Sequence, residues 1–135
     1  MKVTSSDVIV IGGGIMGSSS TFFLRQQGLT VNLLERDQIG QHASGTNFGN
    51  VRRQGRPFYQ IPLANRASDI WRRIPELLGR SIEYVQGGHM RICYRDNPDA
   101  VGIFEQYANG ARELDLALTM LSGDAVRQRF PFLGP

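Results

Sequence analysis

Three glycines near the start of the chain have the spacing of a phosphate-binding turn. Gly12, Gly14 and Gly17 follow the pattern Gly-x-Gly-x-x-Gly, directly after the apolar residues 8–11. One such glycine allows a tight turn, one lets a pyrophosphate approach the backbone, and one lets a helix pack closely on the preceding strand. The N–H groups and dipole of the following helix then stabilise phosphate charge without a basic side chain. The turn therefore predicts an anion site made of backbone amides.

An acidic residue follows at the spacing needed to hold the sugar of a dinucleotide. Glu35 is 23 positions after Gly12 (35 minus 12) and ends a second apolar segment, residues 30–34. A carboxylate about 20 residues after the first glycine accepts hydrogen bonds from ribose hydroxyls. The same negative charge disfavours a ribose that carries a 2′-phosphate. Together these features predict an adenine-dinucleotide site rather than a plain connection between a strand and a helix.

The elements that must position these residues form a strand–helix–strand unit. Residues 8–11 are a β-branched-rich apolar run, typical of a central parallel strand buried on both faces. Residues 15–27 suit a helix that Gly28 closes, and residues 30–34 suit a second strand. We therefore predict an α/β fold that begins with a Rossmann-like βαβ unit, followed by the start of an α+β domain.

Residues 38–56 form a long segment without a helical or an alternating apolar period. The segment contains four glycines and three arginines. Loops longer than about 12 to 15 residues in compact domains are usually functional or disordered, and this one begins where the ribose would lie. Small polar side chains and glycines in it can approach phosphate or cofactor oxygens. The candidates are Ser44, Thr46, Asn47 and Gly49.

The remaining residues predict helices mixed with short strands. Helical patterns cover residues 61–78, interrupted at Pro75, and residues 99–114, and Ser122 caps a short helix at residues 123–130. Strands are expected at residues 116–121 and around 89–94, where His89 and Cys93 alternate with apolar side chains that bury one face. We place the cofactor-binding portion at residues 1–80 and the beginning of a substrate-binding portion at 81–135. The chain looks truncated, because it ends without a third parallel strand.

Composition limits the classes of protein that remain. The chain has 135 residues, 41% hydrophobic and 20% charged, with a formal net charge of +3. Scattered arginines give little support to nucleic-acid binding. Cys93 stands alone, so no intrachain disulfide is possible, and the start of the chain lacks a signal region. No apolar run reaches the roughly 18 residues of a transmembrane helix. We therefore expect a cytoplasmic protein without a metal site.

Several segments resemble the N-terminal part of the D-amino-acid oxidase family of flavoproteins, which includes glycine oxidase and sarcosine oxidase. The segments are GGGIMGSS, LLER and ASGTNFGNVR, and the similarity continues through YQIPLANRASDIW and GGHMRICY. The resemblance covers nearly the entire chain, and its specificity comes mainly from the Ser-Gly-Thr-Asn loop and the segment after it. It implies FAD as cofactor and oxidation of a C–N bond.

The resemblance also implies roles for individual residues. Gly12, Gly14, Ile15 and Met16 would line the pyrophosphate turn, Glu35 and Arg36 the adenosine end, and Ser44, Thr46, Asn47 and Gly49 the path toward the flavin. In sarcosine-oxidase-like relatives an arginine beyond this loop binds the substrate carboxylate, which suits the bidentate guanidinium. Arg52 is the candidate here, and Arg53 and Arg56 compete with it. Some relatives tether flavin through histidine or cysteine, but His42, His89 and Cys93 are assigned no role.

The sequence supports three functional hypotheses. The leading one is an FAD-dependent oxidoreductase that oxidises an amine or amino acid by hydride transfer to flavin. The alternatives are an NAD-dependent dehydrogenase, which the long loop disfavours, and a non-catalytic dinucleotide-binding subunit of a larger complex. Sarcosine, glycine, proline derivatives and opines remain equally open as substrates, as does the electron acceptor. We expect the 135-residue piece alone to be inactive, and to need partner subunits or the remaining part of the same chain.

Overall fold

The protein is a mixed α/β chain that divides into two compact units, Met1–Asn50 and Val51–Pro135. The structure, a computed structural model, describes residues 5–94 and 96–133. The predicted division at residue 80 between a cofactor-binding and a substrate-binding portion stays a prediction.

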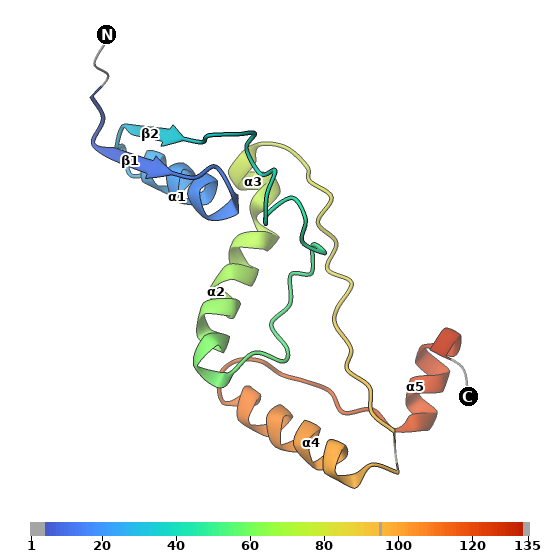
Figure 1. Ribbon diagram of the computed structural model, residues 1–135. Helices are drawn as coiled ribbons and strands as arrows, with labels where there is room; N and C mark the ends of the chain where they lie inside the picture. Colours follow the sequence, from blue (N-terminus) through green and yellow to red (C-terminus); the bar gives the residue numbers. More distant parts are fainter. Residues whose placement is uncertain (1–4, 95, 134–135) are drawn as a thin grey trace. The chain divides into compact units, whose positions relative to one another are not determined.

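The first unit is built from two parallel strands and one helix (Figure 1). Strand β1 (Val8–Ile11) pairs with β2 (Val31–Leu34), and helix α1 (Ile15–Gln26) connects them and packs on both. Gly28 has a φ of +84° and its N–H donates to Arg25 O at 3.0 Å, which closes α1 as predicted. The predicted strand–helix–strand unit is therefore present, with shifts of one residue at the ends of α1 and β2.

Strand β1 is not buried on both of its faces. Among the described residues it pairs with β2 alone, and α1 packs against the two strands. Ile9 and Ile11, which alternate with the partly buried Val8 and Val10, are 60% and 86% exposed. The prediction of two-sided burial is therefore wrong for the described part of the chain. A continuous apolar run indicates that both faces can be buried, but each face still needs a layer to cover it.

Asp7 and Thr30 fasten the beginnings of the two strands to each other. The Thr30 N–H and hydroxyl donate to Asp7 Oδ2 at 2.7 and 2.6 Å, and the Asp7 N–H donates to Thr30 Oγ1 at 3.0 Å. The Thr30 side-chain hydrogen bond, followed by the Thr30 backbone N–H, lowers the pKa of Asp7 below its usual 3.8. The ionised carboxylate therefore stabilises the folded unit.

The hydrogen bonds between Asp7 and Thr30 predict that the stability of the fold depends on pH. Because the pKa of Asp7 is lowered on folding, its contribution is complete well above pH 3.8 and is lost as the pH falls below that value. We expect Asp7→Asn to lower the unfolding midpoint at pH 7, and the difference from the natural protein to shrink at pH 3. Thermal unfolding followed by circular dichroism measures both values. Glu105→Gln, an exposed change on α4 (Pro98–Arg112), is the control; an equal loss at both pH values would contradict the prediction.

The second unit consists of short helices and irregular segments. A 3₁₀ turn, η1 (Phe58–Gln60), leads into α2 (Ile61–Arg72) and α3 (Ile74–Leu78), and α4 is followed by α5 (Gly123–Arg129) and a last 3₁₀ turn, η2 (Pro131–Leu133). Pro75 lies in the first turn of α3, so it interrupts the predicted helix at the expected place. Asn97 Oδ1 accepts from Ala100 N at 3.0 Å and Ser122 Oγ from Ala125 N at 3.3 Å, which caps α4 and α5.

A small core joins α2 to α4 in this unit. Ile61, Ala111 and Leu116 are buried against one another. The Tyr107 ring stacks on Phe58 with centroids 5.3 Å apart. Gly110 makes this contact possible, since a Cβ there would lie 2.6 Å from Phe58 Cζ. The core thus fixes η1 and α2 relative to α4.

Two predicted strands are not formed. Residues 89–94 and 116–121 have no regular secondary structure, and His89 and Cys93 are exposed together with the apolar side chains between them. The expected burial of one face of residues 89–94 is therefore wrong as well. A strand needs a neighbouring strand for its backbone hydrogen bonds, and the described residues offer none here.

Candidate functional site

The glycine turn lies between β1 and α1 and requires glycine at two of its positions. Gly12 has a φ of +103°, which side chains other than hydrogen rarely allow, and its N–H donates to Leu34 O at 2.8 Å. A Cβ at Gly17 would lie 1.8 Å from Gly12 O and 3.3 Å from Val10 Cγ1. These contacts show that the backbone of α1 at Gly17 lies too close to the turn and to β1 for a side chain to fit between them. The turn is thus held at the carboxyl ends of both strands.

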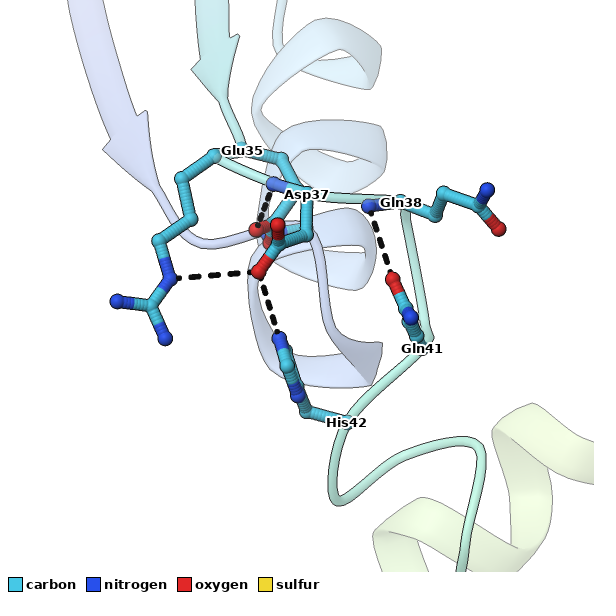
Figure 2. A network of polar contacts seen from close by, with 7 residues as sticks. Glu35, Asp37, Gln38, Gln41 and His42 are labelled. Carbon is cyan, nitrogen blue, oxygen red and sulfur yellow. Dashed lines mark hydrogen bonds and ion pairs between the residues drawn. The ribbon is translucent and has the colours of Figure 1, made fainter.

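The Glu35 carboxylate lies directly against this turn. Its Oε2 accepts from the buried Gly13 N–H at 2.7 Å, and its Oε1 accepts from Asp37 N–H at 3.0 Å, a bond drawn in Figure 2. The Gly13 N–H, followed by the Asp37 N–H, lowers the pKa of Glu35 below its usual 4.5. Glu35 is therefore ionised at neutral pH beside the backbone amides of the turn.

The ionised carboxylate keeps capacity for further donors. A carboxylate offers about four lone-pair sites, and the two backbone N–H groups occupy one on each oxygen of Glu35. Two acceptor sites are therefore left, which matches the two hydroxyls of one ribose. A phosphate at the same place would meet an uncompensated negative charge.

Ser44 connects the long loop to the beginning of α1. Its Oγ accepts from Ile15 N–H at 2.8 Å, and a Cβ at Gly14 would lie 3.0 Å from this oxygen. Met16 is 77% exposed. Among the described residues no group accepts from the N–H of Met16 or Gly17, since these belong to the first turn of the helix. These N–H groups remain available to an anion, while Ser44 holds the loop beside them.

The loop after β2 is organised by Asp37. Its Oδ2 lies 3.0 Å from His42 Nε2 and 3.5 Å from Arg36 Nε, and Figure 2 shows Asp37 between Glu35 and His42. The Arg36 side chain is 85% exposed, and its role at the adenosine end stays a prediction. His42 is an exposed partner of Asp37.

Three other predicted loop residues bond within the loop itself. Asn47 donates from its side chain to Ser44 O, and its Oδ1 accepts from Gly49 N–H at 2.7 Å. Thr46 Oγ1 donates to His42 O at 3.3 Å. The structure therefore brings Glu35 and Ser44 to the glycine turn, whereas Thr46, Asn47 and Gly49 shape the loop. Their roles toward flavin stay predictions.

Two neighbours of the turn escaped the sequence analysis. Gly40 N–H donates to Gly13 O at 3.1 Å, and a Cβ at Gly13 would lie 3.0 Å from Ile39 Cγ1. Gly40 has a φ of +76°. A glycine soon after the acidic residue was the available signal, because it allows the chain to turn back toward the phosphate loop.

The three candidate arginines of the loop lie in the second unit and differ in what their guanidinium groups contact. Arg53 Nη1 donates to Asn65 Oδ1 at 3.1 Å, and Arg56 Nε donates to Arg52 O at 3.1 Å. Arg52 is half-buried and donates to Gln54 O through one nitrogen. No carboxylate lies within 4.0 Å of these three groups in the described part of the chain. Each guanidinium thus donates through one nitrogen to another described residue, and these contacts do not select one of the three arginines.

The described residues contain no cluster of three or more His, Cys, Asp or Glu side chains that could hold a metal ion. Each helix among residues 5–94 and 96–133 is also too short or too polar to cross a lipid bilayer.

The residues present fit a dinucleotide at the turn. Among the described residues no group accepts from the N–H of Met16 or Gly17 at the beginning of α1, and Gly14 leaves room for Ser44 Oγ beside this turn. The ionised Glu35 stands beside the same turn to accept from a ribose. No basic side chain is needed at this place, because the helix terminus supplies the positive potential.

Comparison with known proteins gives the same picture. The family model described as FAD dependent oxidoreductase (DAO) matches residues 7–135. The monomeric sarcosine oxidase of Streptomyces avermitilis is 31% identical over 134 residues, which cover 96% of this chain and 33% of the relative. N-methyl-L-tryptophan oxidase of Yersinia pestis is 24% identical over 129 residues, with coverages of 93% and 33%.

A third relative is the FAD-dependent oxidoreductase domain-containing protein 1 of Xenopus laevis. It is 26% identical over 140 residues, which cover 95% of this chain and 28% of the relative. No solved structure matches the chain. The chain thus spans about a third of the length of the curated relatives that it matches.

Proposed function

The chain belongs to the DAO family of FAD-dependent oxidoreductases, and we propose that it forms the dinucleotide-binding part of an enzyme that oxidises the C–N bond of an amine or amino acid. The observation that carries this proposal is the 2.7 Å hydrogen bond from Gly13 N–H to Glu35 Oε2. The bond holds the Glu35 carboxylate beside the turn that precedes α1, which supports a role for Glu35 in binding the ribose.

The proposal divides the work of binding FAD among a few groups. The N–H groups of Gly14 and Met16, from which no described residue accepts, take the diphosphate, supported by the dipole of α1. Glu35 accepts from the two hydroxyls of the adenosine ribose. Ser44 orients the first turn of α1 through its bond to Ile15 N–H. The remaining proposed contacts with the cofactor are made by Ile15, Arg36, Thr46, Asn47 and Gly49.

Bound flavin would supply the redox step, in which a hydride leaves the carbon next to the amine nitrogen and the resulting imine is hydrolysed by water. The contribution of this chain is positioning. Arg52 is proposed to bind the substrate carboxylate, as the resemblance implies; it is half-buried and, like Arg53 and Arg56, has no carboxylate within 4.0 Å in the described residues. A carboxylate held there fixes the orientation of the amine.

The relatives support an amine or amino acid as substrate without selecting one. One of them is named for sarcosine and another for N-methyl-L-tryptophan, both N-methylated amino acids. The family match favours FAD over NAD. If the protein were instead a non-catalytic subunit of a larger complex, the FAD that it binds would not be reduced by an amine.

The test uses the full-length natural protein. It is purified, denatured, and the released cofactor is identified by chromatography and mass spectrometry. It is then titrated without oxygen with sarcosine, glycine, N-methyl-L-tryptophan and proline. We expect FAD to be released and the flavin absorbance near its visible maximum to bleach with at least one amine. Release of NAD would contradict the proposal, and FAD that no amine reduces would favour the non-catalytic role.

A further inference from the structure

We propose that Arg91 and Arg52 together form one anion site, and that a single carboxylate lies between their two guanidinium groups. The proposal that this carboxylate belongs to the substrate rests on the proposed function, whereas the anion site itself does not. Arg91 lies in the irregular segment 89–94, which we predicted from the sequence to be a strand and in which His89 and Cys93 were assigned no role.

The two guanidinium groups both lie close to Gly55. The position that a Cβ of Gly55 would occupy is 2.8 Å from Arg52 Nη1 and 3.7 Å from Arg91 Nη1. The two nitrogens are therefore no farther apart than these distances added together, about 6.5 Å. A charge-assisted bond is about 2.8 Å long, so one carboxylate oxygen can join nitrogens up to about 5.6 Å apart, and both oxygens of one carboxylate reach farther. One carboxylate can thus contact both groups.

Neighbouring contacts hold both arginines in place. Arg52 donates to Gln54 O, and the Gln54 side chain lies 2.9 Å from His89 Nδ1. The Arg91 guanidinium lies over the Phe104 ring, 4.8 Å from its centroid. The contact between Gln54 and His89 therefore links the loop that carries Arg52 to the segment that carries Arg91. Phe104 on α4 stabilises the Arg91 guanidinium through a cation–π contact.

The described residues provide no counterion for these guanidinium groups. Arg52 and Arg91 repel each other at this separation, and Arg56 Nε bonds to the backbone Arg52 O. In the described residues no carboxylate comes within 4.0 Å of these three groups. Like charges that are held together without a counterion favour an anion between them.

Gly55 lets the Arg52 guanidinium lie close to the backbone of the loop. It has a φ of +76°, and a side chain there would meet Arg52 Nη1 at 2.8 Å. A larger residue at this position would therefore displace Arg52 from its place near Arg91.

The test measures binding of acetate, the simplest carboxylate, to the full-length natural protein. Line broadening of ¹³C-labelled acetate gives the dissociation constant without any signal from the cofactor. We expect Arg91→Gln and Arg52→Gln each to raise this constant about tenfold or more, since each removes a charge-assisted bond. Arg91→Lys keeps the charge and should restore part of the affinity. Arg112→Gln, an exposed change at the end of α4, should leave it unchanged.

The two guanidinium groups act on one ligand, so Arg52→Gln combined with Arg91→Gln should lose less than the two single losses added together. Acetate binding by Arg91→Gln that equals the natural protein, in a variant with an unchanged circular dichroism spectrum, would overturn the proposal. Absence of any specific acetate binding in the natural protein would do the same. The acetate measurement uses no flavin signal. Its outcome is therefore separate from the identification of the cofactor, which tests the proposed function.

Discussion

The Gly17→Ala protein is expected to be purified with little or no FAD. A Cβ at this position would lie 1.8 Å from the backbone oxygen of Gly12, and a backbone atom cannot move aside as a flexible side chain can. The first turn of α1 must then shift away from β1, at a cost of about 1 to 3 kcal/mol or more. Because the same turn would hold the diphosphate, we expect the FAD content per protein to fall about tenfold or more. Absorbance of the purified protein measures this ratio.

Gly102→Ala is the matched control for this change. Gly102 is in the interior of α4, and a Cβ there meets no atom within 4 Å. Alanine in a helix interior is favoured over glycine by about 0.5 to 1 kcal/mol, so this variant should keep its FAD and be slightly more stable. If Gly17→Ala retained as much FAD as Gly102→Ala, close packing at the turn would not matter for cofactor binding.

The Glu35→Ala protein is expected to bind FAD more weakly by at least about tenfold, since each charge-assisted bond to a ribose hydroxyl contributes that much. The change removes two acceptor oxygens and also frees the Gly13 and Asp37 N–H groups. Glu35→Gln should have a dissociation constant for FAD between those of the natural protein and Glu35→Ala, because it keeps one acceptor oxygen and loses the charge. Fluorescence titration of the cofactor-free protein with FAD gives the three dissociation constants.

Glu105→Ala, an exposed carboxylate on α4, removes the same charge away from the turn and should leave FAD affinity unchanged. A dissociation constant for Glu35→Ala equal to that of Glu105→Ala would remove Glu35 from the cofactor site. A loss of FAD affinity that ADP-ribose does not share would place the effect outside the adenosine half of the cofactor.

The strand–helix–strand unit at residues 8–34 and the place of Glu35 after it were predictable because local rules determine them. The spacing of Gly12, Gly14 and Gly17 has a steric reason that the contact between Gly17 and Gly12 O shows directly. Gly28 closes the helix because its φ of +84° suits glycine, and Glu35 follows the second strand at the expected distance from Gly12. None of these features depends on distant parts of the chain.

The predictions that depended on tertiary partners were wrong. Alternation around Cys93 and the apolar residues 116–121 indicated strands, yet strands form only where another strand accepts their hydrogen bonds. Ile9 and Ile11 suit a buried strand, but among the described residues no layer covers their face. Residue types show which faces can be buried, and the partner that buries them has to be present.

Within the candidate site, the sequence identified the acid and missed its supports. Glu35 followed from its spacing, whereas its second donor, the Asp37 N–H, depends on how the loop turns after β2. The contact of Gly40 N–H with Gly13 O is likewise a matter of loop conformation. Arg91 could not be connected with Arg52 from the sequence, because their proximity is produced by the loop around Gly55.

The most direct test of the account is a crystal structure of the full-length protein with its cofactor bound. We predict that diphosphate oxygens accept hydrogen bonds from N–H groups at the beginning of α1, including Met16, and that Glu35 accepts from both hydroxyls of the adenosine ribose. A diphosphate bound elsewhere on the protein, or a Glu35 side chain turned away from the ribose, would contradict the account.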